Sequence, residues 1–224
     1  MEVSKRIFNL ETETAFSILA KANNLAAKGK DIINLGIGQP DFPTPINIQE
    51  AAIKAIKDGH HGYTPSNGIP ELRESISELV LNKYKANIKP ENVLITPGGK
   101  PVIFISALLL GSEDREIIFP DPGFPIYRSM IKYSGAKAVP LKLSEKDNFE
   151  INTEQLKELI SDKTSLIIIN NPNNPTGSYM NKKKITGLPP GVIKILSDLI
   201  FVLYFLSTNS EIASRNSGIP FDGV

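Results

Sequence analysis

Cysteine is absent from this sequence, and only two of its 224 residues are histidine. Without cysteine, the chain can form neither a disulfide framework nor a thiolate metal site. The two histidines, His60 and His61, are neighbours, and adjacent side chains of an extended segment point to opposite faces. We therefore expect no metal site at this pair, and we place both histidines at the surface.

A strong net charge and a long apolar run are also missing. Lysine and arginine number 25 against 24 acidic residues, so a net charge of +1 gives no general electrostatic reason to bind nucleic acid or an anionic membrane. The longest apolar run, residues 199–206, is far too short to span a bilayer. The first residues include acids and lack the apolar region of a signal peptide. These features predict a soluble, cytoplasmic protein with no nucleic-acid or membrane partner.

The composition, 41% hydrophobic and 22% charged, provides enough apolar side chains for a sizeable core. Strand patterns alternate with helix patterns across short loops, which is typical of a three-layer α/β fold with a mostly parallel sheet between two layers of helices. The helix expected at 102–110 is almost entirely apolar and is predicted to be buried. The expected strands are 32–35, 93–96, 117–119, 136–141, 165–170 and 195–198; the expected helices are 14–28, 46–57, one starting at Pro70, 102–110, one ending at 134, and one ending near 160 with Asn152 as its N-cap.

The stretch from Ile167 to Gly177, IIINNPNNPTG, joins a strand pattern to a turn pattern. Its isoleucines predict a buried parallel strand. The prolines that follow lack backbone donors and end that strand. The asparagines of the turn, including Asn174, therefore come at the carboxyl end of a strand, which is where open α/β sheets bind ligands.

A second candidate segment, TPGGK at residues 96–100, follows another expected strand and opens a helix. Gly98 and Gly99 let a ligand approach the backbone, and the helix start offers N–H groups and the positive end of the helix dipole. This pattern favours phosphate binding. It is not a P-loop, and the earlier GIGQPD segment is not a dinucleotide fingerprint because no third glycine opens a helix after it.

Two further side chains follow expected strands. Phe124 lies in the stiff segment DPGFPIY, where an aromatic side chain can stack on a planar ligand, although core packing is the alternative. Asp198 ends the segment ILSD, and a buried carboxylate there needs a partner such as a protonated ring nitrogen, whereas surface exposure is the alternative. Together with the phosphate-binding turn and the asparagines, these residues describe a site for a phosphorylated aromatic cation.

The segments LGIGQPDFPTP, GYTPSNGIPELR, ITPGGKP, FPDPGFPIY, INNPNNPTG and ILSD occur in the order and approximate spacing of class I/II aminotransferases, and the sequence resembles this family from about residue 32 to residue 198. These are fold type I enzymes that depend on pyridoxal 5′-phosphate (PLP). The resemblance implies a dimeric transaminase that moves an amino group between an amino acid and a 2-oxo acid. It also implies an N-terminal helix and substrate-loop segment at 1–44, followed by a partial PLP-binding large domain at 45–224.

The resemblance assigns roles at the phosphate and substrate end of the site. Gly38 lies in the loop that meets the substrate carboxylate through a backbone N–H. Tyr63 reaches across the dimer to the phosphate of the neighbouring subunit. Gly99 and Lys100 supply N–H groups to the phosphate of their own subunit.

The resemblance also assigns three residues to the cofactor ring. Phe124 stacks on the pyridine, and Asn174 hydrogen-bonds its phenolic oxygen. Asp198 pairs with the pyridinium nitrogen, which raises the pKa of that nitrogen and keeps the cofactor an electron sink.

Several features depart from the family pattern. The family's Schiff-base lysine lies in a later Ser-Lys segment that this sequence does not contain, so we assign no catalytic residue. Phe201 stands where the family usually has a tyrosine, and TGLPPG interrupts a segment that is helical in the family. We therefore interpret the chain as a truncated or drifted aminotransferase fragment, inactive as written.

Two other readings stay open at this point. One is a non-catalytic protein that keeps the PLP fold for binding or dimerisation. The other is an S-adenosylmethionine-dependent methyltransferase, with GIG as its glycine turn and NPNNP as an Asn-Pro catalytic turn. The latter needs an acid after the strand that follows GIG, and none is well placed.

Overall fold

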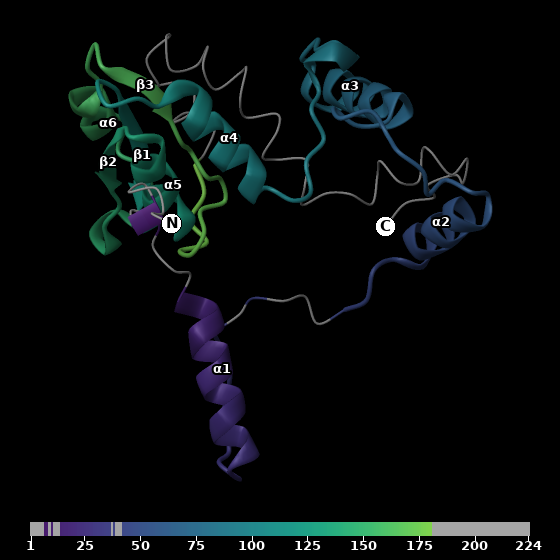
Figure 1. The fold of residues 1–224 in the computed structure, drawn as a ribbon. Helices are drawn as coiled ribbons and strands as arrows, with labels where there is room; N and C mark the ends of the chain where they lie inside the picture. Colours follow the sequence, from purple (N-terminus) through teal and green to yellow (C-terminus); the bar gives the residue numbers. More distant parts are fainter. Residues whose placement is uncertain (1–6, 9, 11–13, 37, 39–41, 181–224) are drawn as a thin grey trace, which may run out of the picture. The chain divides into compact units, whose positions relative to one another are not determined.

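The computed structural model describes residues 7–8, 10, 14–36, 38 and 42–180 (Figure 1). These residues belong to two compact units, one within 1–39 and 103–198 and the other within 40–102 and 199–224. Each unit is considered by itself below. The expected strand at 195–198, with Asp198, lies outside the described residues, as does Phe201.

The helices of the described chain lie close to the expected ones, and the predicted helix 46–57 is reproduced without change. No helix in this part of the chain is long and apolar enough to cross a membrane. The α-helices are α1 (Thr14–Ala27), α2 (Ile46–Lys57), α3 (Pro70–Tyr84), α4 (Lys100–Leu110), α5 (Ile126–Ser134) and α6 (Thr153–Leu159), with short 3₁₀ turns η2 (Pro90–Asn92) and η3 (Glu145–Asp147).

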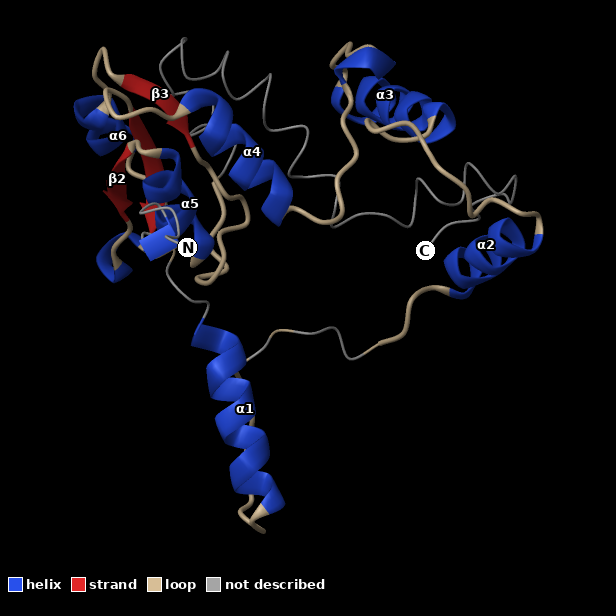
Figure 2. Ribbon diagram, in the orientation of Figure 1, coloured by secondary structure: helices blue, strands red, loops and turns tan. Residues whose placement is uncertain are grey.

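The first unit contains a three-stranded sheet of order β2-β1-β3, in which both pairings are parallel (Figure 2). Ile118 of the central strand pairs with Val139 on one side and Ile167 on the other, so these side chains share one face. The predicted parallel sheet is confirmed for these strands. Their bounds are β1 (Glu116–Asp121), β2 (Lys137–Lys142) and β3 (Thr164–Ile167).

Helices cover both faces of this sheet. Leu156 of α6 is completely buried in a cluster with Ile118 on one face. On the other face, the guanidinium of Arg128 in α5 lies over the ring of Phe119, the next residue of β1. Adjacent strand residues point to opposite faces, so the two helices lie on opposite sides. The unit therefore has the helix–sheet–helix layers that the sequence predicts.

Asn152 caps α6 as expected. Its Oδ1 atom accepts hydrogen bonds from the backbone N–H groups of Glu154, at 3.0 Å, and Gln155, at 3.2 Å. Two of the N–H groups that a helix start leaves unpaired are thereby satisfied.

The expectation that helix α4 is buried is only half correct. Ile103 and Ala107 are buried, but Leu108 is 43% exposed and Leu109 77% exposed. On its covered side, the ring of Phe104 lies 5.6 Å from that of Tyr133. An apolar helix is buried all round only when other elements surround it, and this helix has such partners on one side within the described structure.

Two expected strands are absent, so those predictions are wrong. Residues 93–96 pair with no strand of the described chain; the backbone N–H of Ile95 instead donates to the Asn67 carbonyl at 3.1 Å. Residues 32–35 are irregular, and Leu35 is 90% exposed. An apolar β-branched run becomes a strand only when a neighbour completes its hydrogen-bond ladder.

The second unit has a small core of its own between α3 and the segment after η2. Ile76, Leu79 and Val80 are buried against Val93, as the helical spacing predicts. Gly68 lies beside this core with φ +103°, and a Cβ there would meet Cγ1 of Ile95 at 2.3 Å. Glycine is therefore required at this position by both its backbone conformation and the close contact.

Candidate functional site

The loop after β1 carries Phe124 and is held at both ends. Asp121, the last residue of β1, accepts hydrogen bonds from Lys142 and from Arg128, the latter at 3.4 Å. Gly123 lies so close to the preceding chain that a Cβ would meet the carbonyl oxygen of Pro120 at 2.2 Å. The charged pairs and this close contact fix the backbone on which Phe124 is presented.

The Phe124 side chain is half-buried and packs edge-to-face on Tyr127. The ring centroids are 5.9 Å apart with an interplanar angle of 79°, the arrangement that aromatic pairs favour. The backbone N–H of Tyr127 also donates to the Phe124 carbonyl at 3.1 Å. Burial raises the pKa of Tyr127 to about 12, so its phenol stays neutral and the contact does not change near neutral pH.

The second loop, after β3, folds into a closed turn. The backbone N–H of Asn173 donates to the Ser178 carbonyl at 2.7 Å, and that of Gly177 donates to the Asn173 carbonyl at 2.8 Å. Gly177 adopts φ +70°, which favours glycine. Asn173 is buried within this turn, whereas its neighbour Asn174 is exposed.

A side-chain hydrogen bond joins the two loops. Nδ2 of Asn173 donates to the carbonyl oxygen of Pro122 at 3.3 Å and to Oγ1 of Thr176 at 2.9 Å. The structure thus brings together the loops that carry Phe124 and Asn174, at the carboxyl ends of neighbouring parallel strands. This is the sheet edge at which a ligand site was expected.

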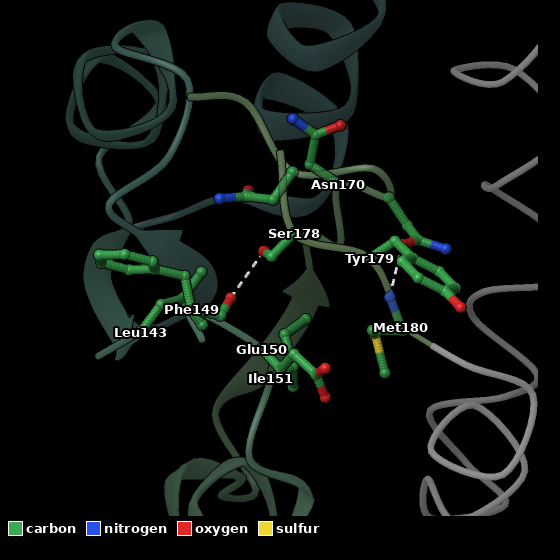
Figure 3. Close-up of a pocket in the computed structure, with 10 residues that line it drawn as sticks. Leu143, Phe149, Glu150, Ile151, Asn170, Ser178, Tyr179 and Met180 are labelled. Atoms are coloured by element: carbon green, nitrogen blue, oxygen red, sulfur yellow. Dashed lines mark hydrogen bonds between the residues drawn. The ribbon is translucent and has the colours of Figure 1, made fainter. Parts of the chain in front are cut away.

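A small hollow, with about 10 Å³ of space for a water molecule, lies beside the asparagine turn (Figure 3). The Oγ of Ser178 donates to the Phe149 carbonyl at 2.8 Å, and the Met180 N–H donates to Oδ1 of Asn171 at 2.8 Å, so hydrogen bonds tie its walls together (Figure 3). Neither Phe124 nor Asn174 lines it. Its walls are Leu143, Phe149, Glu150, Ile151, Asn170, Asn171, Asn173, Ser178, Tyr179 and Met180.

The glycine turn that was predicted to bind phosphate belongs to the second unit, whose first segment ends at Val102. Helix α4 begins at Lys100, directly after this turn, as expected. Within it, Gly98 has φ +86° and donates its N–H to the Thr96 carbonyl at 2.9 Å. The Thr96 hydroxyl donates back to the Gly98 carbonyl at 2.7 Å. The turn is therefore closed on itself, with Gly99 and Lys100 following at the helix start; their shared anion site stays a prediction.

Comparison of the sequence with models of known protein families identifies the family of this chain. The model described as aminotransferase class I and II matches residues 30–202. The chain belongs to the class I and II aminotransferase family. The cofactor of that family is PLP, and the methyltransferase reading is set aside.

Individual aminotransferases resemble the chain over most of its length. A probable aspartate/prephenate aminotransferase of Aquifex aeolicus is 37% identical over 219 residues, which is 96% of this chain and 55% of the relative. An aspartate aminotransferase of Bacillus subtilis is 36% identical, over 90% of this chain and 51% of the relative. The chain thus spans about half the length of these curated relatives.

Solved structures show the same likeness in three dimensions. The aspartate aminotransferase from Thermus thermophilus with maleate matches with a TM-score of 0.81 and 28% identity, covering 88% of this chain and 50% of that one. The fold is accordingly a partial aminotransferase α/β domain, in agreement with the parallel sheet and its two helix layers.

The aminotransferase residues that the structure describes fit the chemistry of PLP. Phe124 offers an aromatic side chain on a fixed loop, and the exposed Asn174 offers an amide on the adjoining loop. The turn before α4 offers the start of an apolar helix after two glycines, the arrangement that suits a phosphate. The described chain thus contains an aromatic side chain and an amide that suit the ring, and a helix start that suits the phosphate.

For three other predicted site residues, the described part of the structure shows no contact that bears on the predicted role. Tyr63 is 111% exposed, and Gly38 is exposed with no atom within 4 Å of a Cβ built there. Asp198 lies outside the described residues. His60 and His61 are exposed, as expected, and the described residues contain no group of three or more histidine, cysteine, aspartate or glutamate side chains suited to a metal ion.

The sequence reasoning missed the particular position of Asn173. The residue pattern predicted amides after a strand, and the resemblance gave a role to Asn174 alone, but Asn173 is only 6% exposed and connects the loops. The sequence offers no signal that separates Asn173 from Asn174, because the two carry the same amide and both lie between Pro172 and Pro175.

Proposed function

We propose that this chain supplies the ring-binding and phosphate-binding part of a PLP-dependent aminotransferase acting on an amino acid and a 2-oxo acid. The observation that carries the proposal is the joining of the Phe124 and Asn174 loops by the Asn173 amide, at the carboxyl edge of the sheet. The names of the relatives, aspartate and aspartate/prephenate aminotransferases, support the substrate classes.

The ring end of the proposed site uses three residues. Phe124 stacks on the pyridine face, and its contact with Tyr127 holds it ready for this role. Asn174 donates its amide hydrogen to the phenolic oxygen. Asp198 accepts from the ring nitrogen and favours its protonated form. PLP, when bound, supplies the electron sink that the chemistry at the substrate Cα requires.

The phosphate and substrate end uses backbone groups. Gly99 and Lys100 donate N–H groups at the start of α4, where the helix dipole also favours an anion. Gly38 meets the substrate carboxylate. Tyr63 contacts the phosphate of a second subunit, a role that requires the exposed position it has in the single chain. The active form that we propose is therefore a cytoplasmic homodimer.

The proposal separates binding from turnover. Transamination needs a base at the substrate Cα, and a positioned general base contributes roughly 10²–10⁴-fold. The printed sequence offers no lysine that matches the family's cofactor-binding segment. We therefore expect this polypeptide to bind PLP reversibly and not to transaminate at a useful rate.

A PLP titration followed by absorbance and by fluorescence quenching tests the proposal. Saturable, reversible binding that weakens in Phe124→Leu and Asn174→Ala supports it. Asn24→Ala, an exposed position on α1, is the matched control for the asparagine change and should bind as the unmodified chain does. Binding that is absent, or that is unaffected by both site changes, would contradict the proposal.

The proposed assembly has its own measurement. Sedimentation of the chain at micromolar concentration should reveal a dimer, the commonest closed assembly of identical chains. A well-folded monomer under these conditions would contradict the dimer while leaving the PLP site to be decided by the titration.

A further inference from the structure

Asn173 and Asn174 are consecutive asparagines in different environments. Asn174 is exposed, whereas Asn173 is 6% exposed and its side chain points into the protein. The ligand-binding amide is therefore attached directly to a buried amide. What holds the buried amide also sets the position of the exposed one.

The backbone of Asn173 is anchored in its own turn. Its N–H donates to the Ser178 carbonyl at 2.7 Å, and its carbonyl accepts from the Gly177 N–H at 2.8 Å. These bonds leave the side chain as the part that extends toward a neighbour. A residue fixed by both backbone groups can transmit the position of one loop to another.

Both amide hydrogens of Asn173 are used. One is donated to Oγ1 of Thr176 at 2.9 Å, within the turn, and the other to the carbonyl oxygen of Pro122 at 3.3 Å, in the loop after β1. Pro122 lies two positions before Phe124 in the sequence. The contact thus joins the segment that presents the aromatic ring to the segment that presents the ligand amide.

The acceptor end of the same side chain contributes no hydrogen bond. Within the described part of the chain, Oδ1 of Asn173 is buried and has no partner. An unpaired buried acceptor is unfavourable, so the amide stabilises this position through its donor group alone. Aspartate has the same shape as asparagine but no N–H to donate to the Pro122 carbonyl. The change Asn173→Asp therefore tests the loss of the donor while the packing volume stays the same.

We propose that Asn173 is a positioning residue that couples the two ring-binding loops and sets Phe124 and Asn174 in register for one planar ligand. This inference rests on the proposed PLP-binding function for the identity of the ligand. The coupling itself is a property of the chain without ligand. It can therefore be tested separately.

Hydrogen–deuterium exchange of the ligand-free chain tests the coupling. We compare the unmodified chain with Asn173→Ala and Asn173→Asp, using peptides that cover 121–127 and 171–180. Both variants should raise exchange in both loops, roughly five- to tenfold, as expected for the loss of one buried hydrogen bond. A rise confined to 171–180, or no rise, overturns the proposal, because Asn173 then stabilises only its own turn.

Asn171→Ala is the matched control. Asn171 lies in the same turn, and its Oδ1 accepts from the Met180 N–H at 2.8 Å, a bond inside the second loop. This variant should raise exchange only within 171–180. A comparable rise across 121–127 would show that any disturbance of the turn spreads, and it would overturn the specific role of Asn173.

The ligand-bound measurement uses PLP itself. An achiral chromophore acquires circular dichroism when a chiral site fixes its orientation, so the induced band reports positioning separately from affinity. Asn173→Asp should lose most of this band and bind PLP roughly tenfold more weakly, while Asn171→Ala retains both. An unchanged band in Asn173→Asp overturns the proposal. If the unmodified chain binds no PLP, the proposed function fails and the exchange data still decide the coupling.

If both Asn173 variants fail to fold, as shown by the loss of a cooperative unfolding transition, Thr176→Val provides a second test of the coupling. It keeps Asn173 and nearly the same volume, but removes the oxygen that orients the amide. Higher exchange across 121–127 in this variant supports the coupling, and unchanged exchange there overturns it.

Discussion

The guanidinium carbon of Arg128 lies 5.4 Å from the centroid of the Phe119 ring. Arg128 reaches this position from α5, and its Nη2 atom also contacts Asp121 at the end of β1 at 3.4 Å. A single cation therefore ties a helix to both an aromatic side chain and a carboxylate of the central strand. The ligand-carrying loop begins at that carboxylate.

Replacing Arg128 with alanine should lower the free energy of unfolding by about 0.7–2 kcal/mol. A cation–π contact contributes about 0.5–1 kcal/mol and a partly exposed ion pair about 0.2–1 kcal/mol. Urea denaturation measures the change. Arg115→Ala is the control, because its contact with Asp114 is long, at 3.8 Å, and exposed; its effect should stay below about 0.5 kcal/mol. Equal effects of the two changes would contradict the role given to Arg128.

A methyl group at Gly123 should disturb the loop of Phe124. The Cβ of Gly123→Ala would meet the Pro120 carbonyl oxygen at 2.2 Å, and a backbone atom cannot move aside cheaply. We expect a loss of about 1–3 kcal/mol in unfolding free energy and weaker PLP binding. Gly62→Ala, which has no atom within 4 Å of its Cβ, should leave both measurements unchanged. A Gly123 variant with normal stability and binding would show that this contact does not shape the loop.

Glu116 should make the stability of the sheet depend on pH. Hydrogen bonds from Lys137, at 2.8 Å, and from Ser161 lower the pKa of Glu116 from its ordinary value of 4.5. Because the folded pKa is the lower one, the stabilisation is present above pH 4.5 and is lost as the pH falls through the folded pKa.

The variant Glu116→Gln tests this dependence. It should be less stable than the unmodified chain at pH 7, and the difference should shrink as the pH falls below 4.5. Urea midpoints across this range measure it. Glu158→Gln, an exposed position on α6, provides the control. A difference for Glu116→Gln that is constant with pH would mean that the carboxylate charge contributes nothing.

Lys100 should not become the covalent partner of PLP. Its backbone lies at the start of α4, at the proposed phosphate end of the ligand, so we expect its side chain not to reach the aldehyde carbon. Borohydride reduction of the PLP-treated chain followed by peptide mapping should show no stoichiometric adduct there. Lys100→Arg, which cannot form the adduct, provides the background. A stoichiometric adduct on Lys100 with measurable transamination would contradict the proposed division between binding and turnover.

Local signals allowed the sequence to predict much of the fold. Pro45 precedes α2 and Gly59 follows it with φ +88°, so both ends of that helix could be assigned. Asn152 likewise identified the start of α6. Such signals act within a few residues, so they can be interpreted from the local sequence without knowledge of the rest of the molecule.

Features that depend on distant partners were harder to predict. The run at 93–96 has the composition of a strand but finds no strand to pair with in the described structure. The apolar faces of α4 look alike in the sequence, although only some of them are covered. Asn173 and Asn174 have identical side chains, and their different roles follow from which of them faces Pro122, a residue 51 positions earlier.

The order of the strands also determines how the sheet assembles. Of the described strands, β1 comes first in the chain and lies in the middle of the sheet. Glu116 of β1 pairs with Lys137 of β2, 21 positions later in the sequence. Its partner in β3, Thr164, is more than twice as far away in the sequence. Closing the shorter connection costs less chain entropy, so we expect β1 to pair with β2 before it pairs with β3. The asparagine turn follows β3, so on this order we expect it to reach the loop after β1 only once β1 and β2 have paired.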